Sequence, residues 1–432
     1  MGRALWSCWL IALLVAFDVA CTDEAPPPPS PSPAPTPSAS IAPAAPVGPL
    51  GPDPDRWVES RLRDDPPDAD WLERAESLRL QVMVSAFDAD GRLEEHGFRL
   101  GEDYVYPASA IKTLLAIAAL RYVRALEEER GVKLGVNARF KRCRYDRSRC
   151  KPPDADKDDD DDDDADDDPH EGRLSLREEI HRLLAYSDND SYDRLYDLLG
   201  HARLNEEMAA LGLSSVRFRH RLSTVRDRRR TRRVLLLPWR GRPFVLPLRR
   251  STLALSNTPA SRLLVGTRHR TSKGLIEGPM DFSEKNYASL FDLHRATLAV
   301  VRPDLARLEL GLDEAQREAL VRPMTGHILP GKRGATHKPM LPGVLRVLPR
   351  ERIRYVNKAG RAYGFHLDSA YIEDKQTGRA MMLSAAVYAN PNGVLNDDDY
   401  AYKETSGPVL AWLGEVFSRE VLRPAATTSP AP

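Results

Sequence analysis

The chain has 432 residues, with 63 basic and 63 acidic side chains and only 4 cysteines. This length allows one large or two ordinary domains and excludes a small scaffold held together by disulfides. Zero net charge argues against a protein that wraps nucleic acid over its whole surface, because that task needs a broad excess of Lys and Arg.

The N-terminus has the pattern of an export signal. Residues 4–17 are an apolar stretch behind a single Arg3, too short to span a bilayer comfortably but long enough for a signal-peptide core. We expect residues 1–20 to be a signal peptide. Val19-Ala20-Cys21 resembles the end of a bacterial lipoprotein signal, with Cys21 as the lipidation site, although Asp18 replaces the aliphatic residue of that pattern. An uncleaved membrane anchor is the alternative.

A proline-rich linker follows the signal. Thirteen of the 29 residues from Pro26 to Pro54 are proline, which prevents a ladder of backbone hydrogen bonds and favours an extended spacer. We therefore assign residues 21–55 to the lipidation site and linker. At about 3.1 Å per residue the linker would hold the folded part roughly 90 Å from the membrane. The expected location is the cell envelope, on the periplasmic side, as an exported and membrane-anchored lipoprotein.

Predicted strands lie at the two ends of the folded part. Residues 78–87 form a β-rich run, residues 88–91 have turn chemistry, and residues 92–100 can return as a second strand. Near the C-terminus, residues 361–372 and 379–390 alternate as two more strands. A last helix is expected to begin near Ser406, with Pro408 in its first turn and one apolar face.

The middle of the chain is predicted to be helical. Ser175 and Glu178 have the spacing of a capping box that opens a helix ending at Ala185. Four further helices are expected at 190–199, 205–211, 286–302 and 313–321. This order predicts an α+β fold, in which an antiparallel sheet is built from both chain ends, flanked by helices, with an inserted all-helical domain.

The corresponding domain boundaries are 56–107 and 322–421 for the sheet domain, 108–321 for the helical domain, and 422–432 for a disordered tail. Two charged insertions lie in the helical domain: 154–168 carries twelve Asp and one Lys, and 217–233 carries nine Arg and one Asp. Neither is expected in the core. The acidic run lacks the turn Gly and spaced Glu of a calcium loop, so a solvated loop is favoured. The Arg run could bind phosphates or anionic lipid, or pair with the Asp run.

The number and placement of the cysteines predict one disulfide in the folded part. Beyond the signal only Cys143 and Cys150 remain, and in an oxidising compartment they can close a small loop, with two free thiols as the alternative. A zinc site would need two more nearby ligands, and only His170 lies close in sequence. We therefore expect no metal and no cofactor. The histidines are expected at the surface or in satisfied positions.

The first candidate catalytic pair is Ser109 and Lys112. Pro107 marks the start of a helix with apolar positions at Ile111, Leu114, Leu115 and Ala118. Ser109 would lie in its first turn, where free N–H groups and the helix dipole favour developing negative charge. Lys112 lies one turn on, and a lysine among apolar neighbours loses its charge more easily and can accept the serine proton. Ser148 and Lys151 share this spacing but open no apolar helix.

Two further motifs follow in the chain. Ser187-Asp188-Asn189 lies between two predicted helices, where a hydroxyl can relay a proton and an amide can hold a carbonyl; simple helix capping is the alternative. Lys358-Ala359-Gly360 precedes a predicted strand, and its small residues let a substrate lie against the backbone. Lys332-Arg333-Gly334 has the same outer residues but lies in a Gly- and Pro-rich loop.

In this order and context, the three motifs resemble those of the penicillin-recognising serine enzymes, and most closely the class A β-lactamases. The resemblance extends from the opening hairpin to the final helix. It implies Ser109 as the acylated nucleophile, Lys112 as its proton acceptor and Ser187 as the proton relay. It also implies substrate-binding positions and an oxyanion hole formed by two backbone N–H groups. The substrate-binding residues would be Asn189, Lys358, Ala359, Gly360 and Arg361, and the N–H groups those of Ser109 and Arg361.

The chain departs from this family pattern in two places. The family usually has Thr or Ser between the Lys and Gly of the third motif, where this chain has Ala359; the neighbouring Arg361 is the candidate substitute. Class A enzymes also carry a Glu after the second motif that activates the deacylating water. Residues 216–224 contain no carboxylate, and the nearest later candidates for a deacylation base are Glu277 and Glu284.

The sequence thus predicts an exported serine hydrolase that forms an acyl-enzyme at Ser109 with β-lactams or related amides. One alternative is a D,D-carboxypeptidase or transpeptidase acting on cell-wall peptides. Another is a non-catalytic lipoprotein that keeps the fold for binding. No G-x-S-x-G elbow, P-loop or zinc-helix motif occurs. The expected partners are the small-molecule or peptide substrate and the membrane, without nucleic acid, and the expected state is a monomer.

Overall fold

The computed structural model describes residues 54–67, 70–87, 93–143, 150, 170–224, 227–238, 240–327 and 337–423. Several sequence predictions lie outside these residues. They are the signal peptide with Cys21, nearly all of the proline-rich linker, the turn at 88–91, the acidic run at 154–168, the second Ser-x-x-Lys at Ser148, the Lys332 motif, and the tail from residue 424.

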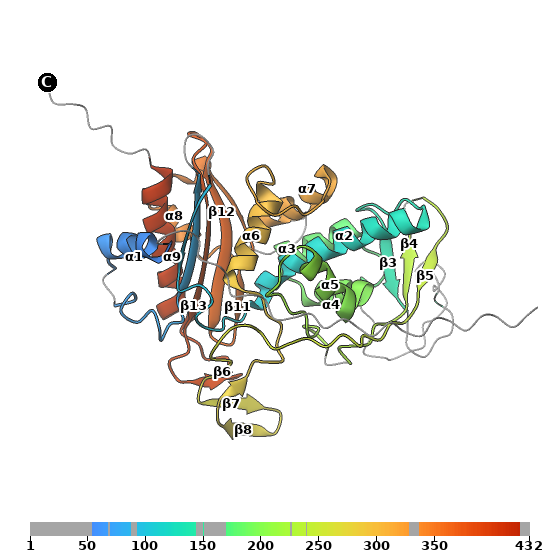
Figure 1. The fold of residues 1–432 in the computed structure, drawn as a ribbon, viewed down its shortest axis with the longest axis horizontal. Coiled ribbons are helices and arrows are strands. Elements are labelled where there is room, and N and C mark those ends of the chain that lie inside the picture. Colours follow the sequence, from blue (N-terminus) through green and yellow to red (C-terminus); the bar gives the residue numbers. More distant parts are fainter. Residues whose placement is uncertain are drawn as a thin grey trace, which may run out of the picture. The chain divides into compact units, whose positions relative to one another are not determined.

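The central sheet is antiparallel and is built from both ends of the described chain (Figure 1), as predicted. β1 (Gln81–Phe87) and β2 (Leu93–Phe98) come from the N-terminal part. β10 (Ile353–Asn357), β11 (Gly360–Ala362), β12 (Phe365–Asp374) and β13 (Ala380–Tyr388) come from the C-terminal part. The order is β10-β12-β13-β1-β2, and β11 pairs with β12. The strand expected at 361–372 is divided into β11 and β12 by a turn at Tyr363 and Gly364, which have φ values of 55° and 79°.

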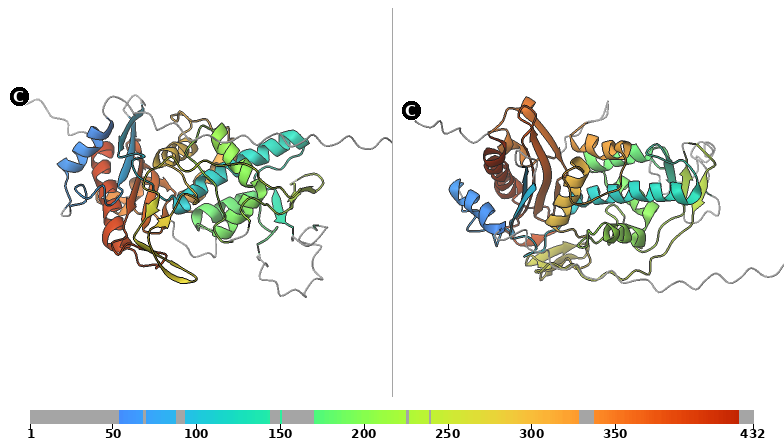
Figure 2. Two further views of the ribbon diagram at one scale, coloured as in Figure 1. Left: turned by 60° about the horizontal axis from the view of Figure 1, so that its bottom comes forward. Right: turned by 45° about the horizontal axis from the view of Figure 1, so that its top comes forward.

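Helices cover both faces of this sheet. α1 (Pro54–Asp64), α8 (Leu341–Val344) and α9 (Gly407–Phe417) lie on one side, and α6 (Leu290–Val301) lies on the other (Figures 1 and 2). The side chains of β13 alternate between two apolar clusters, with Met381, Leu383 and Ala385 on the α9 side and Met382 on the other side. This period of two is what a central strand buried on both faces requires.

The helical region is organised around one central helix. η1 (Ala108–Ile111) continues directly into α2 (Lys112–Arg130), whose residues 112–120 are all buried. Around it lie α3 (Leu176–Ala185), α4 (Asn189–Leu199), α5 (His201–Ala210) and α7 (Glu314–Met324). The predicted capping box is present, because the Ser175 hydroxyl accepts from the Glu178 N–H and the Glu178 carboxylate accepts from the Ser175 N–H. Short helical turns complete the fold: η3 (Arg350–Arg352), η4 (Tyr402–Ser406) and η5 (Ser418–Leu422).

Residues 108–321 also contain short strands that the sequence did not predict. β3 (Arg139–Arg142), β4 (Val234–Leu237) and β5 (Phe244–Leu246) form one small sheet. β6 (Leu264–Val265) pairs with β9 (Met280–Asp281), and β7 (Arg268–Thr271) pairs with β8 (Gly274–Glu277) and with β14 (Val394–Leu395) from the C-terminal part. Segments of two to four residues are too short to show a periodicity. α6, expected within the helical domain, contacts β12 and β13 of the main sheet.

The expectation that the Arg run stays out of the core is wrong for its first part. Arg217, Arg219 and Arg221 are buried, with 1%, 5% and 4% of their surfaces exposed. Burial of a guanidinium requires partners that satisfy its donors. Arg221 donates to the Asp197 carboxylate, and Arg219 donates to a Glu284 carboxylate oxygen at 3.1 Å. This part of the run therefore helps to fasten the loop after α5.

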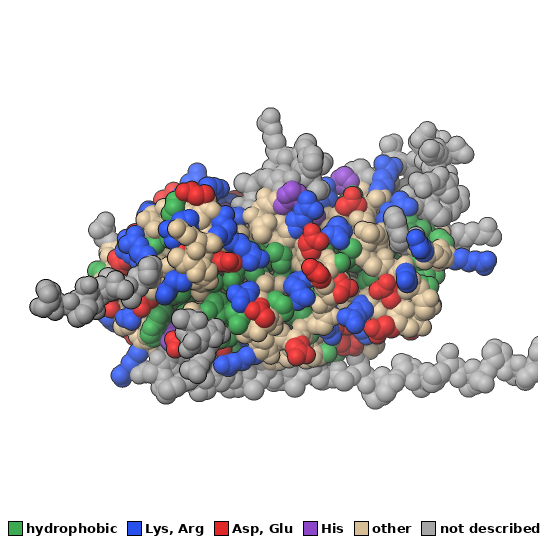
Figure 3. Space-filling view, turned by 90° about the horizontal axis from the view of Figure 1, so that it is seen from above, with side chains coloured by type: hydrophobic (Ala, Val, Ile, Leu, Met, Phe, Trp, Pro, Cys, Tyr) green, Lys and Arg blue, Asp and Glu red, His purple; other side chains and the backbone are tan. Residues whose placement is uncertain are grey.

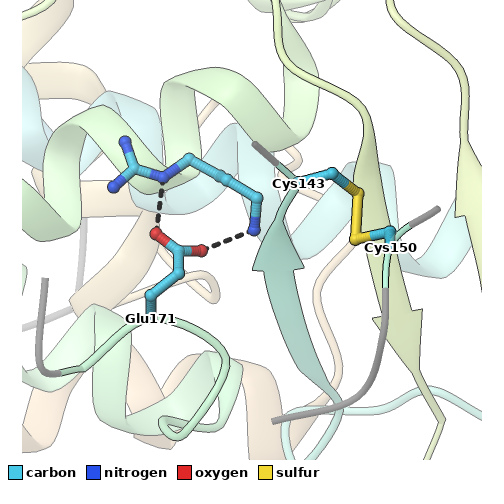
Figure 4. Close-up of a disulfide and its surroundings, with 4 residues drawn as sticks. Cys143, Cys150 and Glu171 are labelled. Atoms are coloured by element: carbon cyan, nitrogen blue, oxygen red, sulfur yellow. Dashed lines mark hydrogen bonds and ion pairs between the residues drawn. A yellow bond between two sulfur atoms is a disulfide. The ribbon is translucent and has the colours of Figure 1, made fainter. Parts of the chain in front are cut away.

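The structure joins Cys143 and Cys150 by a disulfide, with their Cα atoms 5.3 Å apart (Figure 4). Beside it, the Glu171 carboxylate accepts from the Arg142 backbone N–H and, at 2.7 Å, from the Arg142 Nε. The Cys143 N–H also donates, at 2.8 Å, to the carbonyl of Arg233, the residue directly before β4. The bridge thus lies at the end of β3, beside the helical region.

Basic and acidic side chains intermingle over the face shown in Figure 3, in keeping with the equal numbers of the two kinds in the sequence. Among the helices of the described residues, none combines the length and apolar character needed to cross a membrane.

Candidate active site

Ser109 lies in the first turn of η1, as predicted, and its backbone is tightly constrained. Ala108, directly before it, has a φ of 45°, which non-glycine residues seldom adopt. A Cβ atom on Gly360 would come within 2.3 Å of the Pro107 carbonyl oxygen and 3.1 Å of the Ser109 nitrogen. Only glycine therefore lets β11 approach η1 this closely. The contact between the two elements places Ser109 beside the third motif.

Lys112 begins α2 and is completely buried. Its Nζ donates to the carbonyl and to the hydroxyl oxygen of Ser187, the latter at 3.3 Å, and to Asn189 Oδ1 at 2.6 Å. Desolvation, followed by repulsion from the Lys358 ammonium, lowers the pKa of Lys112 from 10.5 to about 6. An ammonium supplies the three N–H donors of these bonds, whereas the neutral amine keeps two and gains a lone pair that can accept a proton.

The second motif forms the corner between α3 and α4. Ser187 has a φ of 58°, and Asp188 caps α4 by accepting from the N–H groups of Asp190 at 2.8 Å and Ser191 at 3.1 Å. Helix capping, the alternative interpretation of this motif, is therefore the role of Asp188. Ser187 and Asn189, on either side of it, are the residues that contact Lys112.

Lys358 and Ala359 lie in the break between β10 and β11, which both pair with β12. Lys358 Nζ donates to Ser187 Oγ at 3.1 Å and to the Ala359 carbonyl at 3.2 Å, and desolvation lowers the pKa of Lys358 to about 8. Ser187 Oγ thus accepts from both lysines. Because a hydroxyl has two lone pairs and one proton, this arrangement leaves the Ser187 O–H free to donate.

These motifs surround one cavity of about 190 Å³. Ser109, Ser187, Lys358, Ala359 and Arg361 line it, so the structure brings together residues from all three motifs. Sequence reasoning missed other members of the lining, among them Tyr186, His337 and Asn357. Of these, Tyr186 adjoins a motif and could have been found on that ground. His337 lies 21 residues before Lys358 and carries no signal in the sequence.

The two candidate deacylation bases are placed elsewhere. Glu277 lies on β8, whose four residues are all exposed, and Glu284 forms ion pairs with Arg219 at 3.1 Å and with Arg228 at 2.8 Å. Neither belongs to the lining of the cavity. The loop at 216–224 is bound to α4, because Asp193 accepts from the N–H groups of residues 222, 223 and 224. The Thr224 hydroxyl also donates to Asp193, at 3.1 Å, and the Arg221 guanidinium donates to Asp197 of the same helix.

Within the described residues, no group of three or more His, Cys, Asp or Glu side chains is arranged to hold a metal ion.

Comparison with solved structures finds several β-lactamases of low sequence identity. A β-lactamase from Xanthomonas campestris is 16% identical, with a TM-score of 0.45, and the match covers 86% of this chain and 99% of that one. One from Sphaerobacter thermophilus is 15% identical, with a TM-score of 0.43 and coverages of 82% and 96%. The β-lactamase from Streptomyces albus G is 16% identical, with a TM-score of 0.42 and coverages of 81% and 96%.

A comparison with curated proteins found no match. The sequence does match the model of the β-lactamase enzyme family over residues 81–403. This stretch runs from the first strand of the central sheet to η4, just before the last long helix, and includes all three motifs. Because the match covers well over half of the chain, the protein belongs to the β-lactamase enzyme family.

Proposed function

We propose that this protein is a serine hydrolase that forms an acyl-enzyme at Ser109 with β-lactams or related amides. The observation that carries the proposal is the buried Lys112, whose pKa is lowered to about 6 and which is hydrogen-bonded to Ser187 and Asn189. A lysine that is uncharged near neutral pH can act as a base, and Ser109 lies one turn before it. Ser109, Ser187 and Lys358 line one cavity, and Lys112 is hydrogen-bonded to Ser187 in its wall.

Acylation would proceed by three proton transfers. Lys112 takes the proton of the Ser109 hydroxyl as its oxygen adds to the substrate carbonyl carbon, and the new oxyanion lies between the N–H groups of Ser109 and Arg361. The carbon–nitrogen bond then breaks, and the leaving nitrogen takes the Ser187 proton. Lys112 returns a proton to Ser187. The products are an ester on Ser109 and a free amine, which stays attached to the acyl group when the substrate is a β-lactam and leaves when it is an open-chain amide.

Substrate binding would use polar groups of Asn189, Lys358 and Arg361. The Oδ1 atom of Asn189 accepts from Lys112, so its amide N–H groups remain to hold a substrate carbonyl. Lys358 and Arg361 supply positive charge for a substrate carboxylate. Gly360 keeps the strand edge close to Ser109, and Ala359 offers no hydroxyl there.

Hydrolysis of the acyl-enzyme is expected to be the slow step. It needs a base aimed at the attacking water, and neither Glu277 nor Glu284 lines the cavity. A slow β-lactamase and a peptidase that works on cell-wall peptides share the acylation chemistry and differ in the acceptor of the acyl group. The signal-like N-terminus supports export as a membrane-anchored lipoprotein, where either substrate would be met.

The test is to incubate the protein separately with benzylpenicillin and with a peptide ending in D-Ala-D-Ala. We expect an intact-mass increase equal to the whole penicillin, because its ring opens without loss of atoms. Release of D-Ala from the peptide at a higher turnover would favour the peptidase. A protein that forms no adduct and releases no product would be a binding protein, and the proposal would be wrong.

A further inference from the structure

The strongest feature that the motifs do not explain is a histidine in the wall of the cavity. His337 lines the cavity together with Lys358 and Arg361. Its Nε2 lies 2.7 Å from the Nε2 of His366, and the two rings stack with centroids 4.9 Å apart and an interplanar angle of 12°. The Nε2 atom of His337 is therefore engaged in a hydrogen bond with His366. The Nδ1 atom of His337 is the ring nitrogen that a bound molecule could contact.

His337 is held at two points, through its ring and through its backbone. His366 is buried on β12, with 2% of its surface exposed, and lies opposite Arg361 in the register of β11 and β12. Asn357 Nδ2 donates to the His337 carbonyl at 2.9 Å and to a carboxylate oxygen of the buried Asp368 at 2.7 Å. Both anchors come from the sheet that carries the third motif, so the histidine has a fixed place relative to Lys358.

The hydrogen bonds around His366 assign the proton positions. Ser406 Oγ lies 2.8 Å from His366 Nδ1 and 3.5 Å from the Tyr402 carbonyl, so its proton is better placed on the imidazole. His366 Nε2–H then donates to His337 Nε2, and His337 carries its own proton on Nδ1. Desolvation, followed by repulsion from Arg361 and Lys358, lowers the pKa of His337 to about 4. Desolvation, followed by repulsion from His337, lowers the pKa of His366 to about 3, so one proton per ring is the expected state at neutral pH.

The charges of the cavity indicate what this donor would meet. Lys358 and Arg361 line it, and its described lining includes no Asp or Glu. At position 359 the side chain is a methyl group, which cannot donate a hydrogen bond to an anion. An anionic group drawn to Lys358 and Arg361 would therefore lie in the same cavity as the uncharged N–H donor of His337.

We propose that His337 is a specificity-determining residue whose Nδ1–H donates to the carboxylate of the substrate, in place of the hydroxyl that Ala359 lacks. His366 is a positioning residue that fixes the ring and its proton. The inference rests on the proposed function, because it assigns to His337 the selection of carboxylate-bearing substrates at that same site.

The test measures binding apart from acylation. In the Ser109→Ala variant, calorimetry gives the Kd of benzylpenicillin and of its uncharged methyl ester. Adding His337→Ala should weaken binding of the acid about tenfold or more, as expected for a lost hydrogen bond to a charged group, and leave the ester within about twofold. Adding Ala359→Thr to His337→Ala should restore most of the loss. His366→Ala should weaken binding of the acid less than His337→Ala does. As with His337→Ala, the loss should be larger for the acid than for the ester.

Equal losses for the acid and the ester would show that His337 only supports the fold, and would overturn the inference. So would an unchanged Kd for the acid, or failure of the acid to bind to Ser109→Ala at all. Slower release of the acyl group in His337→Ala, with unchanged binding, would make His337 a base and also overturn it. Acylation of the wild-type protein is a separate measurement, so failure at Ser109 contradicts the proposed function without deciding the role of His337.

Discussion

The buried basic side chains of this protein have two kinds of hydrogen-bond partner. Lys112 and Lys358, with 0% and 7% of their surfaces exposed, hydrogen-bond to neutral oxygens in the described part of the chain. Arg194 is equally buried, but it pairs with the Glu179 carboxylate at 2.7 Å and 2.8 Å. Lys358 lines the cavity and Lys112 is hydrogen-bonded to Ser187 in its wall, whereas the arginine joins α3 to α4.

The difference shows which charges serve chemistry and which serve the fold. A buried cation without a carboxylate partner is destabilised in its charged form, so its pKa falls and it can exchange protons near neutral pH. A buried arginine paired with a carboxylate stays charged, and the pair is costly to break because the remaining partner is left uncompensated. Substitutions in the two sets should therefore separate activity from stability.

The largest expected effect is the loss of the adduct in Ser109→Ala. Among the described residues, only Ser109 combines a helix N-terminus in the cavity with a lysine one turn on, so the variant should form no covalent product with a labelled β-lactam. Peptide mapping of the wild-type protein should place the label on the peptide that contains Ser109. Undiminished labelling of the variant would show that Ser109 is not the nucleophile, and Ser148 would be the next residue to replace.

Lys112→Met should slow acylation by about 10²–10⁴-fold, because it removes the general base. In the wild-type protein the neutral amine is the active form, so the acylation rate should rise as the pH increases through about 6. The free energy of unfolding of Lys112→Met should equal or exceed that of the wild-type protein, since an apolar side chain replaces a buried amine that is costly to remove from water. Stopped-flow acylation and urea denaturation measure the two quantities. A variant that unfolds easily would contradict the comparison.

Arg194→Met should do the reverse. We expect the free energy of unfolding to fall by about 3–5 kcal/mol, because Glu179 would be left buried without its partner. The acylation rate constant at low temperature should stay near the wild-type value. Arg63→Met, which breaks an exposed pair with Glu59, is the matched control and should change stability by less than about 1 kcal/mol. Similar losses of unfolding free energy in Arg194→Met and Arg63→Met would show that burial does not determine how much these ion pairs contribute to stability.

Replacing both Cys143 and Cys150 with serine should lower the free energy of unfolding by about 2–3 kcal/mol, the entropic value for so short a loop. Acylation should be unaffected, because the bridge lies at the end of β3 and outside the cavity lining. A reductant should lower the free energy of unfolding of the wild-type protein and leave that of the double serine variant unchanged. Alkylation of two free thiols in the exported protein would rule out the bridge.

The smallest expected effect concerns Glu277→Gln and Glu284→Gln. Since neither carboxylate lines the cavity, both variants should keep the wild-type deacylation rate. Pre-steady-state kinetics should show a burst followed by slow turnover, because a missing base costs about 10²–10⁴-fold in the step that it serves. Rapid turnover without a burst, abolished in either variant while acylation persists, would assign that glutamate as the base.

The sequence by itself determined the elements whose signals are local. Pro107 and the apolar spacing behind it predicted the helix that carries Ser109 and Lys112, and the Ser175–Glu178 capping box predicted the start of α3. Both depend on contacts within one or two turns, so neighbouring residues suffice to specify them. The order of strands and helices likewise predicted the sheet built from both chain ends.

Only the tertiary structure decided which distant groups meet. Lys112 contacts Ser187, which lies 75 residues further on, and His337 contacts His366 across 29 residues. The short strands β3 to β9 and the burial of Arg217 and Arg221 also depend on partners supplied by other segments. Such features leave no periodicity in the sequence, because they depend on how separate elements pack and on whether a buried charge finds a partner there.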